Sequence, residues 1–247
     1  MSKNRISVEK KVALVTGGNR GIGFEVCRQL AVLGARVVLT SRNETKGKEA
    51  QTALRKVGVE VDYCRLDVTD DAQIIALKAH VEQHYGRLDI LVNNAGILPD
   101  NLTPGEFSDR SILDTDRKLF VSAFETNALA VIQLCKAVVP LMKKNRFGRI
   151  VNVSSQVAQL TAMDSGIPAY RISKVALNAI TRILADELKD YSILCNCVSP
   201  GWVKTDMGGP QANLSVEEGA KQIVDLACLA DDGPTGTFFR NNQAIEW

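Results

Sequence analysis

The chain has 247 residues, of which 45% are hydrophobic and 23% charged, a composition typical of an ordinary globular protein with a sizeable core. Its formal net charge of +2 gives no electrostatic reason to expect nucleic acid or an anionic membrane as a partner. The first residues are polar and no apolar run is long enough to span a bilayer, so we expect a cytoplasmic protein. The six cysteines are scattered without metal-ligand spacing, and we expect them to be reduced and no metal to be bound.

Apolar strand-like runs alternate with amphipathic helical segments along the chain. The predicted strands cover residues 11–16, 36–40, 61–68, 88–96, 148–155, 192–200 and 235–239. The predicted helices cover residues 23–35, 46–58, 71–86, 119–144 and 169–190. The strands are continuous runs rich in Val, Ile and Leu, which is typical of a parallel sheet buried on both faces. We therefore expect an α/β fold, with a Rossmann-type doubly wound parallel sheet of about seven strands and helices on both faces.

No linker or internal repeat divides the sequence. We therefore predict a single domain over residues 1–247, preceded by a polar N-terminal extension at about residues 1–9.

The first turn between a strand and a helix is rich in glycine. It reads VTGGNRGIG and contains Gly17, Gly21 and Gly23. Glycines allow the backbone to approach a pyrophosphate closely, and the helix that follows offers free N–H groups to that anion. A tight structural turn is the alternative, but the strand before and the helix after it favour a nucleotide site.

The spacing Thr16-Gly17-x-x-x-Gly21-x-Gly23 resembles that of the short-chain dehydrogenase/reductase family. Further marks of this family follow in order, namely NNAG at 93–96, Asn127 within ETNALA, NVSS at 152–155, Tyr170-x-x-x-Lys174 and PGWVKTD at 200–206. The resemblance extends from about Lys11 to Phe239. The stretches VVLTSRNETKG and GTFFRNNQAIEW are similar to the carbonyl-reductase-like members of the family.

The resemblance implies a catalytic set of Asn127, Ser155, Tyr170 and Lys174. Tyr170 would donate a proton to the carbonyl oxygen of the substrate, and Ser155 would hold that oxygen. Lys174 would lie one helical turn away, where an ammonium about 5 Å from the phenol, at an effective dielectric near 20, favours the phenolate by roughly 3 kcal/mol, or about two pKa units. Asn127 would support a proton relay with Lys174. Ser154 is the alternative to Ser155, because consecutive strand residues point to opposite sides.

The end of the second strand indicates which nicotinamide cofactor is bound. An acidic residue there would bind the ribose diol of NAD, but Ser41 stands at this place and Arg42 follows it. A hydroxyl leaves room for the 2′-phosphate of NADPH, and Arg42 and Arg20 can bind that phosphate. We therefore predict NADPH, although two solvated surface arginines are the alternative.

The resemblance assigns further residues to this cofactor. Asp67 and Val68 would border the adenine, and Lys174 would also bind the nicotinamide ribose. The full set of expected cofactor residues is Gly17, Asn19, Arg20, Gly21, Ile22, Gly23, Ser41, Arg42, Asp67, Val68, Asn93, Ala95, Gly96, Tyr170, Lys174, Pro200, Gly201, Val203 and Thr205.

The expected substrate is a small hydrophobic ketone or aldehyde. The segments that follow Gly96, Ser155 and Gly201 offer an apolar lining of Leu98, Val157, Leu160, Met163, Ile167, Trp202 and Met207. A 3-oxoacyl thioester bound to a carrier protein or CoA is the alternative substrate, for which Arg146 is a candidate basic dock. A third possibility is a non-enzymatic NADPH sensor, which would have no need of the proton relay.

We also expect a homodimer or homotetramer. The long insertion before the catalytic tyrosine that makes some animal carbonyl reductases monomeric is absent here, since 14 residues separate Ser155 from Tyr170. By the resemblance, the helices that bear Asn127 and Tyr170 are then free to pair with a second copy.

Overall fold

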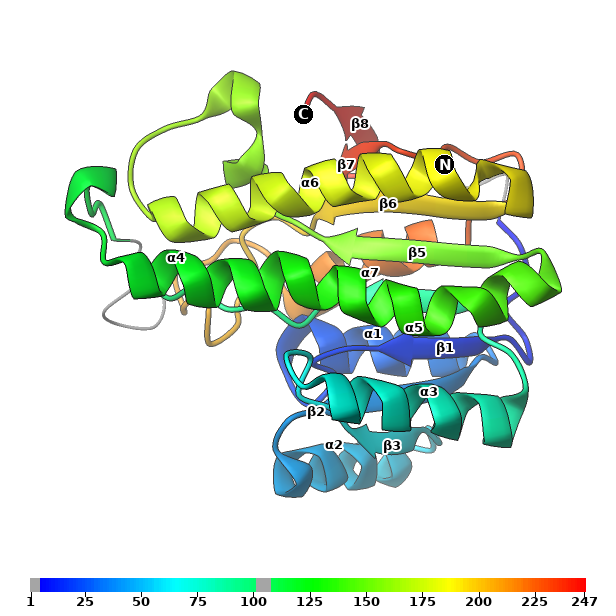
Figure 1. The fold of residues 1–247 in the computed structure, drawn as a ribbon. Helices are drawn as coiled ribbons and strands as arrows, with labels where there is room; N and C mark the ends of the chain where they lie inside the picture. Colours follow the sequence, from blue (N-terminus) through cyan, green and yellow to red (C-terminus); the bar gives the residue numbers. More distant parts are fainter. Residues whose placement is uncertain (1–4, 101–107) are drawn as a thin grey trace.

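The computed structural model describes residues 5–100 and 108–247, in which eight strands join one sheet in the order β3-β2-β1-β4-β5-β6-β7-β8 (Figure 1). The strands are β1 Val12–Val15, β2 Arg36–Ser41, β3 Asp62–Arg65, β4 Ile90–Asn93, β5 Gly148–Val153, β6 Ile193–Ser199, β7 Phe238–Arg240 and β8 Gln243–Ile245. The pairs from β3 to β7 are parallel and β8 is antiparallel to β7. The expected parallel sheet is confirmed, with one more strand than expected.

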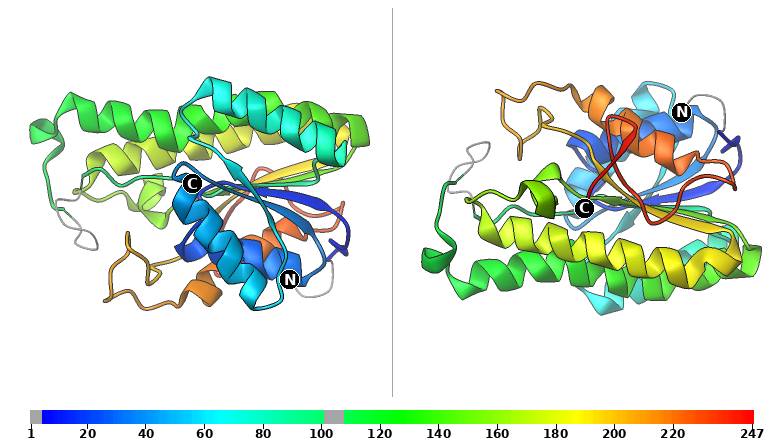
Figure 2. Two further views of the ribbon diagram at one scale, coloured as in Figure 1. Left: turned by 90° about the horizontal axis from the view of Figure 1, so that it is seen from below. Right: turned by 90° about the horizontal axis from the view of Figure 1, so that it is seen from above.

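Helices cover both faces of this sheet, as Figure 2 shows from two sides. On one face lie α1 Gly21–Val32, α2 Glu44–Lys56 and α7 Val216–Ala227. On the other face lie α3 Asp71–Tyr85, α4 Arg117–Phe124, α5 Ala130–Asn145 and α6 Pro168–Leu188. The buried side chains of β1 alternate between the two cores, with Ala13 and Val15 in one and Val12 and Leu14 in the other. This alternation explains why β1 is apolar throughout.

Short helical turns join these elements. They are the 3₁₀ turns η1 Ile112–Asp114, η3 Gln156–Ala158, η4 Leu160–Ala162 and η5 Lys189–Tyr191, and the π-helical turn η2 Glu125–Leu129.

Two elements near the C-terminus were not expected from the sequence. Helix α7 begins at a capping box, in which the Ser215 hydroxyl accepts from the backbone of Glu218 and the Glu218 carboxylate accepts from the backbone of Ser215. Strand β8 returns along β7 after Asn241 and Asn242, whose φ angles of 50° and 58° form a two-residue hairpin turn.

The N-terminal extension packs onto the fold from residue 5 onward. Ile6 donates its backbone N–H to Cys228 at 2.9 Å, and Arg5 forms an ion pair with the buried Asp225. Val8 is buried in the core of the α1 and α7 face. Only the first four residues of the expected polar extension lie outside the described residues.

The segments α4, η2 and α5 form one continuous helix over residues 117–145. By length and composition this helix could cross a membrane, but half of its most apolar window is buried inside the protein. It packs along α3 and α6 on the sheet, so we interpret it as a core helix.

Candidate active site

A cavity of about 1030 Å³ lies at the carboxyl ends of the parallel strands, the side to which the arrows point in Figure 1. The turns after β1, β2, β3, β4, β5 and β6 all contribute to its lining. The chain passes from β1 toward β2 and β3 on one side and returns to β4 on the other side of β1. Ligands of doubly wound sheets bind at this reversal of strand order, because the turns diverge there and leave a crevice.

The glycine-rich turn after β1 forms one wall of the cavity. Gly17 and Gly21 have φ angles of 65° and 53°, and a β-carbon on Gly23 would collide with the carbonyl oxygen of Gly17. Asn94 holds the turn in place, with its side-chain amide 2.9 Å from the Thr16 carbonyl oxygen and 3.2 Å from that of Gly17. Among the described residues, no side chain caps the first N–H groups of α1. This helix end therefore fits a diphosphate.

Two arginines line the adenosine end of the cavity. Arg42 is exposed at its edge, and Arg20 forms an ion pair with Asp206 from the segment after β6. Ser41 is buried and its hydroxyl donates to the carbonyl oxygen of Asn43 at 2.9 Å. Ser41 is thus a small part of the wall, whereas the positive charge that fits a 2′-phosphate comes from Arg42 and Arg20.

Most of the expected cofactor residues lie together in this lining, and Asn93 is the exception. The lining contains Gly17, Asn19, Arg20, Gly21, Ile22, Gly23, Ser41, Arg42, Asp67, Val68, Ala95, Gly96, Tyr170, Lys174, Pro200, Gly201, Val203 and Thr205. Asn93 is buried behind it and donates to the side chain of Asn152 at 2.8 Å. Neighbouring strand residues point to opposite sides, so the next residue, Asn94, faces the cavity in its place.

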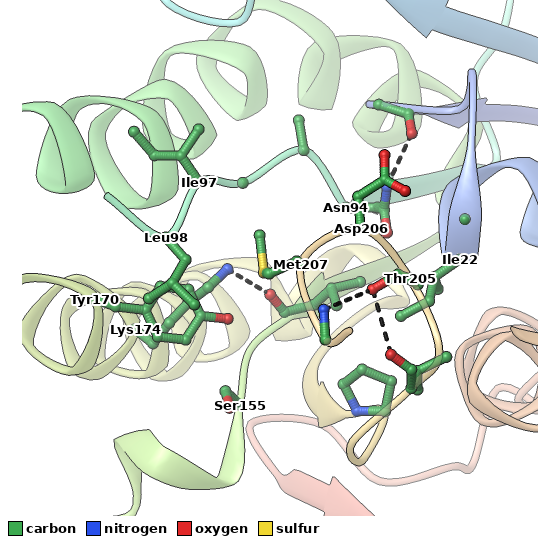
Figure 3. A pocket seen from close by; sticks show the side chains of 18 of the residues that line it. Ile22, Asn94, Ile97, Leu98, Ser155, Tyr170, Lys174, Thr205, Asp206 and Met207 are labelled. Carbon is green, nitrogen blue, oxygen red and sulfur yellow. Dashed lines mark hydrogen bonds between the residues drawn. The ribbon is translucent and has the colours of Figure 1, made fainter. Parts of the chain in front are cut away.

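Tyr170 and Lys174 project from the first turns of α6 into the cavity (Figure 3). Burial raises the pKa of Tyr170 to about 12, and its hydrogen bond with Ser155 opposes this rise. Burial lowers the pKa of Lys174 to about 8. The lysine Nζ donates to the carbonyl oxygen of Val153 at 2.8 Å and lies 5.7 Å from the centre of the tyrosine ring.

This geometry differs from the expectation that Lys174 lowers the pKa of Tyr170. Both side chains are buried. The loss of hydrating water raises the pKa of Tyr170 by more than the hydrogen bond with Ser155 lowers it. Burial thus moves the pKa of Tyr170 in the direction opposite to the one expected from Lys174.

The two serines after β5 have different partners. The Ser154 hydroxyl is buried and donates to the side chain of Asn178 at 2.6 Å. Ser155 is partly exposed to the cavity and lies beside Tyr170 (Figure 3). The geometry thus favours Ser155 as the serine that reaches a substrate oxygen.

Asn127 lies behind Gly96, outside the cavity lining, and is 1% exposed. Its side-chain oxygen accepts from the Ile97 backbone at 2.8 Å, and its amide donates to the Ile97 carbonyl and the Ser173 hydroxyl, each at 2.9 Å. It sits within the π-helical turn that interrupts the long helix, a feature that often marks functional sites. A β-carbon on Gly96 would lie 3.1 Å from the Asn127 oxygen and 3.4 Å from the Lys174 nitrogen.

A buried carboxylate at the start of α6 was not expected from the sequence. Asp100 is 1% exposed, and its two oxygens accept from the backbone N–H groups of Ala169 and Tyr170 at 3.0 and 2.9 Å. It therefore holds the helix end that carries the tyrosine, and its charge suits a helix N-terminus. No local signal marks this contact, because about 70 residues separate the partners.

The substrate end of the cavity is lined by both apolar and polar side chains, and Arg171 is among the polar ones. Of the expected side chains, Leu98, Val157, Ile167, Trp202 and Met207 line it and are joined by Ile97, Gln156, Ser108 and Asp109. Leu160 and Met163 lie outside this lining, and Leu160 is 62% exposed. The candidate dock Arg146 precedes β5 and therefore lies at the amino end of the strands, opposite the cavity.

Comparisons with known proteins agree with this arrangement. The model of the family described as short chain dehydrogenase matches residues 11–214. The chain is 36% identical to (+)-neomenthol dehydrogenase of Arabidopsis thaliana and covers 98% of that protein with 96% of its own residues. It is 33% identical to carbonyl reductase [NADPH] 1 of Rattus norvegicus, with 98% of this chain and 100% of that protein covered.

Solved structures show the same similarity. Salutaridine reductase from Papaver somniferum matches with a TM-score of 0.80 at 32% identity, covering 93% of this chain and 99% of that chain. An NADPH-bound carbonyl reductase from chicken fatty liver matches with a TM-score of 0.84 at 29% identity, covering 97% of this chain and 100% of that chain. The alignment with neomenthol dehydrogenase runs over 294 positions, so this relative carries segments that the 247-residue chain lacks.

Proposed function

The chain belongs to the short chain dehydrogenase family, and on that premise we propose that it reduces a hydrophobic ketone or aldehyde to an alcohol with NADPH. One observation carries the proposal. A protonated phenol, a serine hydroxyl and a buried lysine meet at the inner end of a cavity whose outer end has two arginines. Relatives named carbonyl reductase [NADPH] and a related structure with NADPH bound support the same cofactor.

The chemistry follows from what each residue can hold or move. Bound NADPH supplies the hydride to the carbonyl carbon. The neutral hydroxyl of Tyr170 donates its proton to the oxygen on which negative charge develops. The Ser155 hydroxyl holds that oxygen by a hydrogen bond. Lys174, anchored on Val153, orients the nicotinamide ribose.

Asn127 has a supporting role in this proposal. Its hydrogen bonds to Ile97 hold the segment after β4 in place. Lys174 lies next to this segment, at Gly96. The remaining expected cofactor residues bind NADPH along the rest of the cavity: the glycine turn the diphosphate, Arg42 and Arg20 the 2′-phosphate, and Asp67 and Val68 the adenine.

NADPH oxidation with a small panel of carbonyl compounds tests the proposal. The panel holds an aromatic α-diketone, an aliphatic aldehyde, a quinone and an acetoacetyl thioester, each measured with NADPH and with NADH. Turnover of the free carbonyls with a strong NADPH bias is expected. Turnover confined to the thioester would contradict the proposed substrate class, and tight NADPH binding without any turnover would favour a sensor.

We further propose that the chain acts in the cytoplasm as a single domain that forms a homodimer or homotetramer through the helices that bear Asn127 and Tyr170, namely the continuous helix of residues 117–145 and α6. The two helices border a groove lined by the apolar side chains of Ile132, Cys135, Val139, Pro140, Ile180, Ile183, Leu184 and Leu188 and by the charged Lys136, Lys143 and Glu187. Ile183 is 57% exposed there. Ile183→Glu should lower the mass in solution measured by light scattering, whereas Ile75→Glu on α3 should not, since Ile75 is similarly exposed but lies outside this groove.

A further inference from the structure

One wall of the substrate end of the cavity is formed by a segment with few buried side chains. It runs from Gln156 to Ile167 between β5 and α6, and Gln156, Val157, Ser165, Gly166 and Ile167 line the cavity. Residues 160–165 are exposed. Apart from the buried side chains of Ala158 and Ile167, its position depends on hydrogen bonds rather than on packing.

Among the described residues, Arg171 makes more side-chain hydrogen bonds to this segment than any other residue. Its Nε donates to the Gly166 carbonyl at 2.9 Å, one Nη donates to Ser165 at 3.0 Å, and the other Nη donates to Val157 at 3.0 Å. The second Nη also lies 3.9 Å from the Met163 sulfur. One planar guanidinium thus joins both ends of the segment, which the single ammonium of a lysine could not do.

This contact ties the substrate wall to the catalytic helix. Arg171 follows Tyr170 directly, so the wall and the phenol are held by the same first turn of α6. The junction of the wall and α6 has two further contacts. The Asp100 carboxylate accepts from the Tyr170 backbone, and the Ser108 carbonyl accepts from the Ile167 backbone at 3.0 Å.

We infer that Arg171 determines substrate selectivity by fixing the wall formed by residues 156–167 at a set position relative to Tyr170. The inference rests on the proposed carbonyl reduction. Arg171 is a positioning residue here, because its Nε and both of its Nη nitrogens donate to backbone carbonyls of the wall. A rigid wall favours a compact carbonyl compound over a bulkier one, and a loosened wall weakens this preference.

Three variants test the inference. Arg171→Met keeps the aliphatic stem and removes the donors, and Arg171→Lys keeps the charge but not the fork. Arg146→Met is the matched control, because Arg146 also donates to a backbone carbonyl, that of Asp190, but lies at the far end of the strands. Each variant is assayed with a compact aromatic α-diketone and a bulkier analogue, and NADPH affinity is measured separately.

Arg171→Met should shift the ratio of kcat/KM for the compact over the bulky ketone by about 10-fold toward the bulky one, mainly through KM for the compact ketone. Arg171→Lys should show a smaller shift in the same direction, and Arg146→Met should show none. NADPH affinity should stay within about 2-fold in all three, because the guanidinium contacts only the substrate wall. In Arg171→Met, kcat/KM for a carboxylated ketone should fall by no more than kcat/KM for its neutral analogue.

Limited proteolysis supplies a second measurement that does not require activity. Cleavage by chymotrypsin after Leu160 should be faster in Arg171→Met than in the wild type or in Arg146→Met. An unchanged ratio of kcat/KM in a folded Arg171→Met variant would overturn the inference, as would unchanged cleavage. If the wild type reduces no carbonyl, the proposed function fails, while cleavage at Leu160 still shows whether Arg171 holds the wall.

Discussion

The Lys174 ammonium lies 2.8 Å from the carbonyl oxygen of Val153 and 5.7 Å from the centre of the Tyr170 ring. The lysine is therefore bound to the end of β5 rather than to the phenol. Because both side chains are buried, the neutral form of each is favoured. The pKa of Tyr170 rises to about 12 and the pKa of Lys174 falls to about 8. A phenol with the ordinary pKa of about 10 already carries its proton at neutral pH, so proton donation in the direction of reduction does not require Lys174 to ionise Tyr170.

Replacing Tyr170 by Phe should abolish most of the turnover. Loss of the proton donor should lower kcat by about 10²–10⁴-fold, the usual effect of removing a general acid. The affinity for NADPH, measured by fluorescence titration, should stay close to that of the wild type, since the ring remains. Turnover within about 10-fold of the wild type would mean that another group donates the proton.

The two serines should respond differently to alanine. Ser155→Ala should lower kcat by about 10²-fold, because a hydroxyl that binds the developing oxyanion is lost. Ser154→Ala should keep kcat within a few-fold but lower the free energy of unfolding by about 1–2 kcal/mol, because its bond to the buried Asn178 is lost. Steady-state kinetics and denaturant unfolding of both variants check the assignment, and the reverse pattern would assign catalysis to Ser154.

Arg42→Ala should weaken the preference for NADPH. A charge-assisted bond contributes about 1.5–3 kcal/mol, so kcat/KM with NADPH should fall by about 10- to 100-fold while that with NADH hardly changes. Arg42 is the sharper test than Arg20, whose charge is partly neutralised by Asp206. Arg55→Ala serves as control, because Arg55 is exposed on α2, pairs with Glu60 and lies outside the cavity lining. An equal loss with both cofactors would show that Arg42 does not bind the 2′-phosphate.

Asp100→Ala should loosen the start of the catalytic helix. Two backbone donors lose their acceptor, which should lower the free energy of unfolding by about 1–2 kcal/mol. Displacement of Tyr170 should also lower kcat by about 10-fold at unchanged NADPH affinity. Asp100→Asn retains one acceptor oxygen and should recover part of both losses. A stability loss with unchanged kcat would limit Asp100 to a structural role.

Replacing Lys174 by Met should make the free energy of unfolding depend less on pH in the alkaline range. The folded-state pKa of Lys174, about 8, lies below its ordinary value of 10.5, so between these pH values the unfolded chain binds more protons than the folded one. Stability of the wild type should therefore rise relative to Lys174→Met from about pH 8 to about pH 10.5, by up to about 3 kcal/mol. Urea unfolding of both proteins across this range measures the difference, and a constant difference would contradict a lowered lysine pKa.

Much of the fold follows from local sequence signals. Continuous apolar strands and amphipathic helices alternate, and the central strands β1, β4, β5 and β6 carry their own mark of burial in a parallel sheet. Helix α7 was not expected, although the capping box of Ser215 and Glu218 at its start is a local signal for it. Strand β8 was missed because three partly exposed residues carry no clear strand pattern.

By itself, the sequence determined the order of strands and helices, the glycine turn and the pairing of Tyr170 with Lys174 on one helical face, since each depends on residues a few positions apart. Only the tertiary structure decided that Asn94 rather than Asn93 faces the cavity, that Ser154 is committed to Asn178, and that burial raises the pKa of the phenol. It also decided the contacts of Asp100 with the start of α6 and of Arg171 with the substrate wall. Burial and such contacts depend on which distant segments pack together, and no local pattern of residues records that.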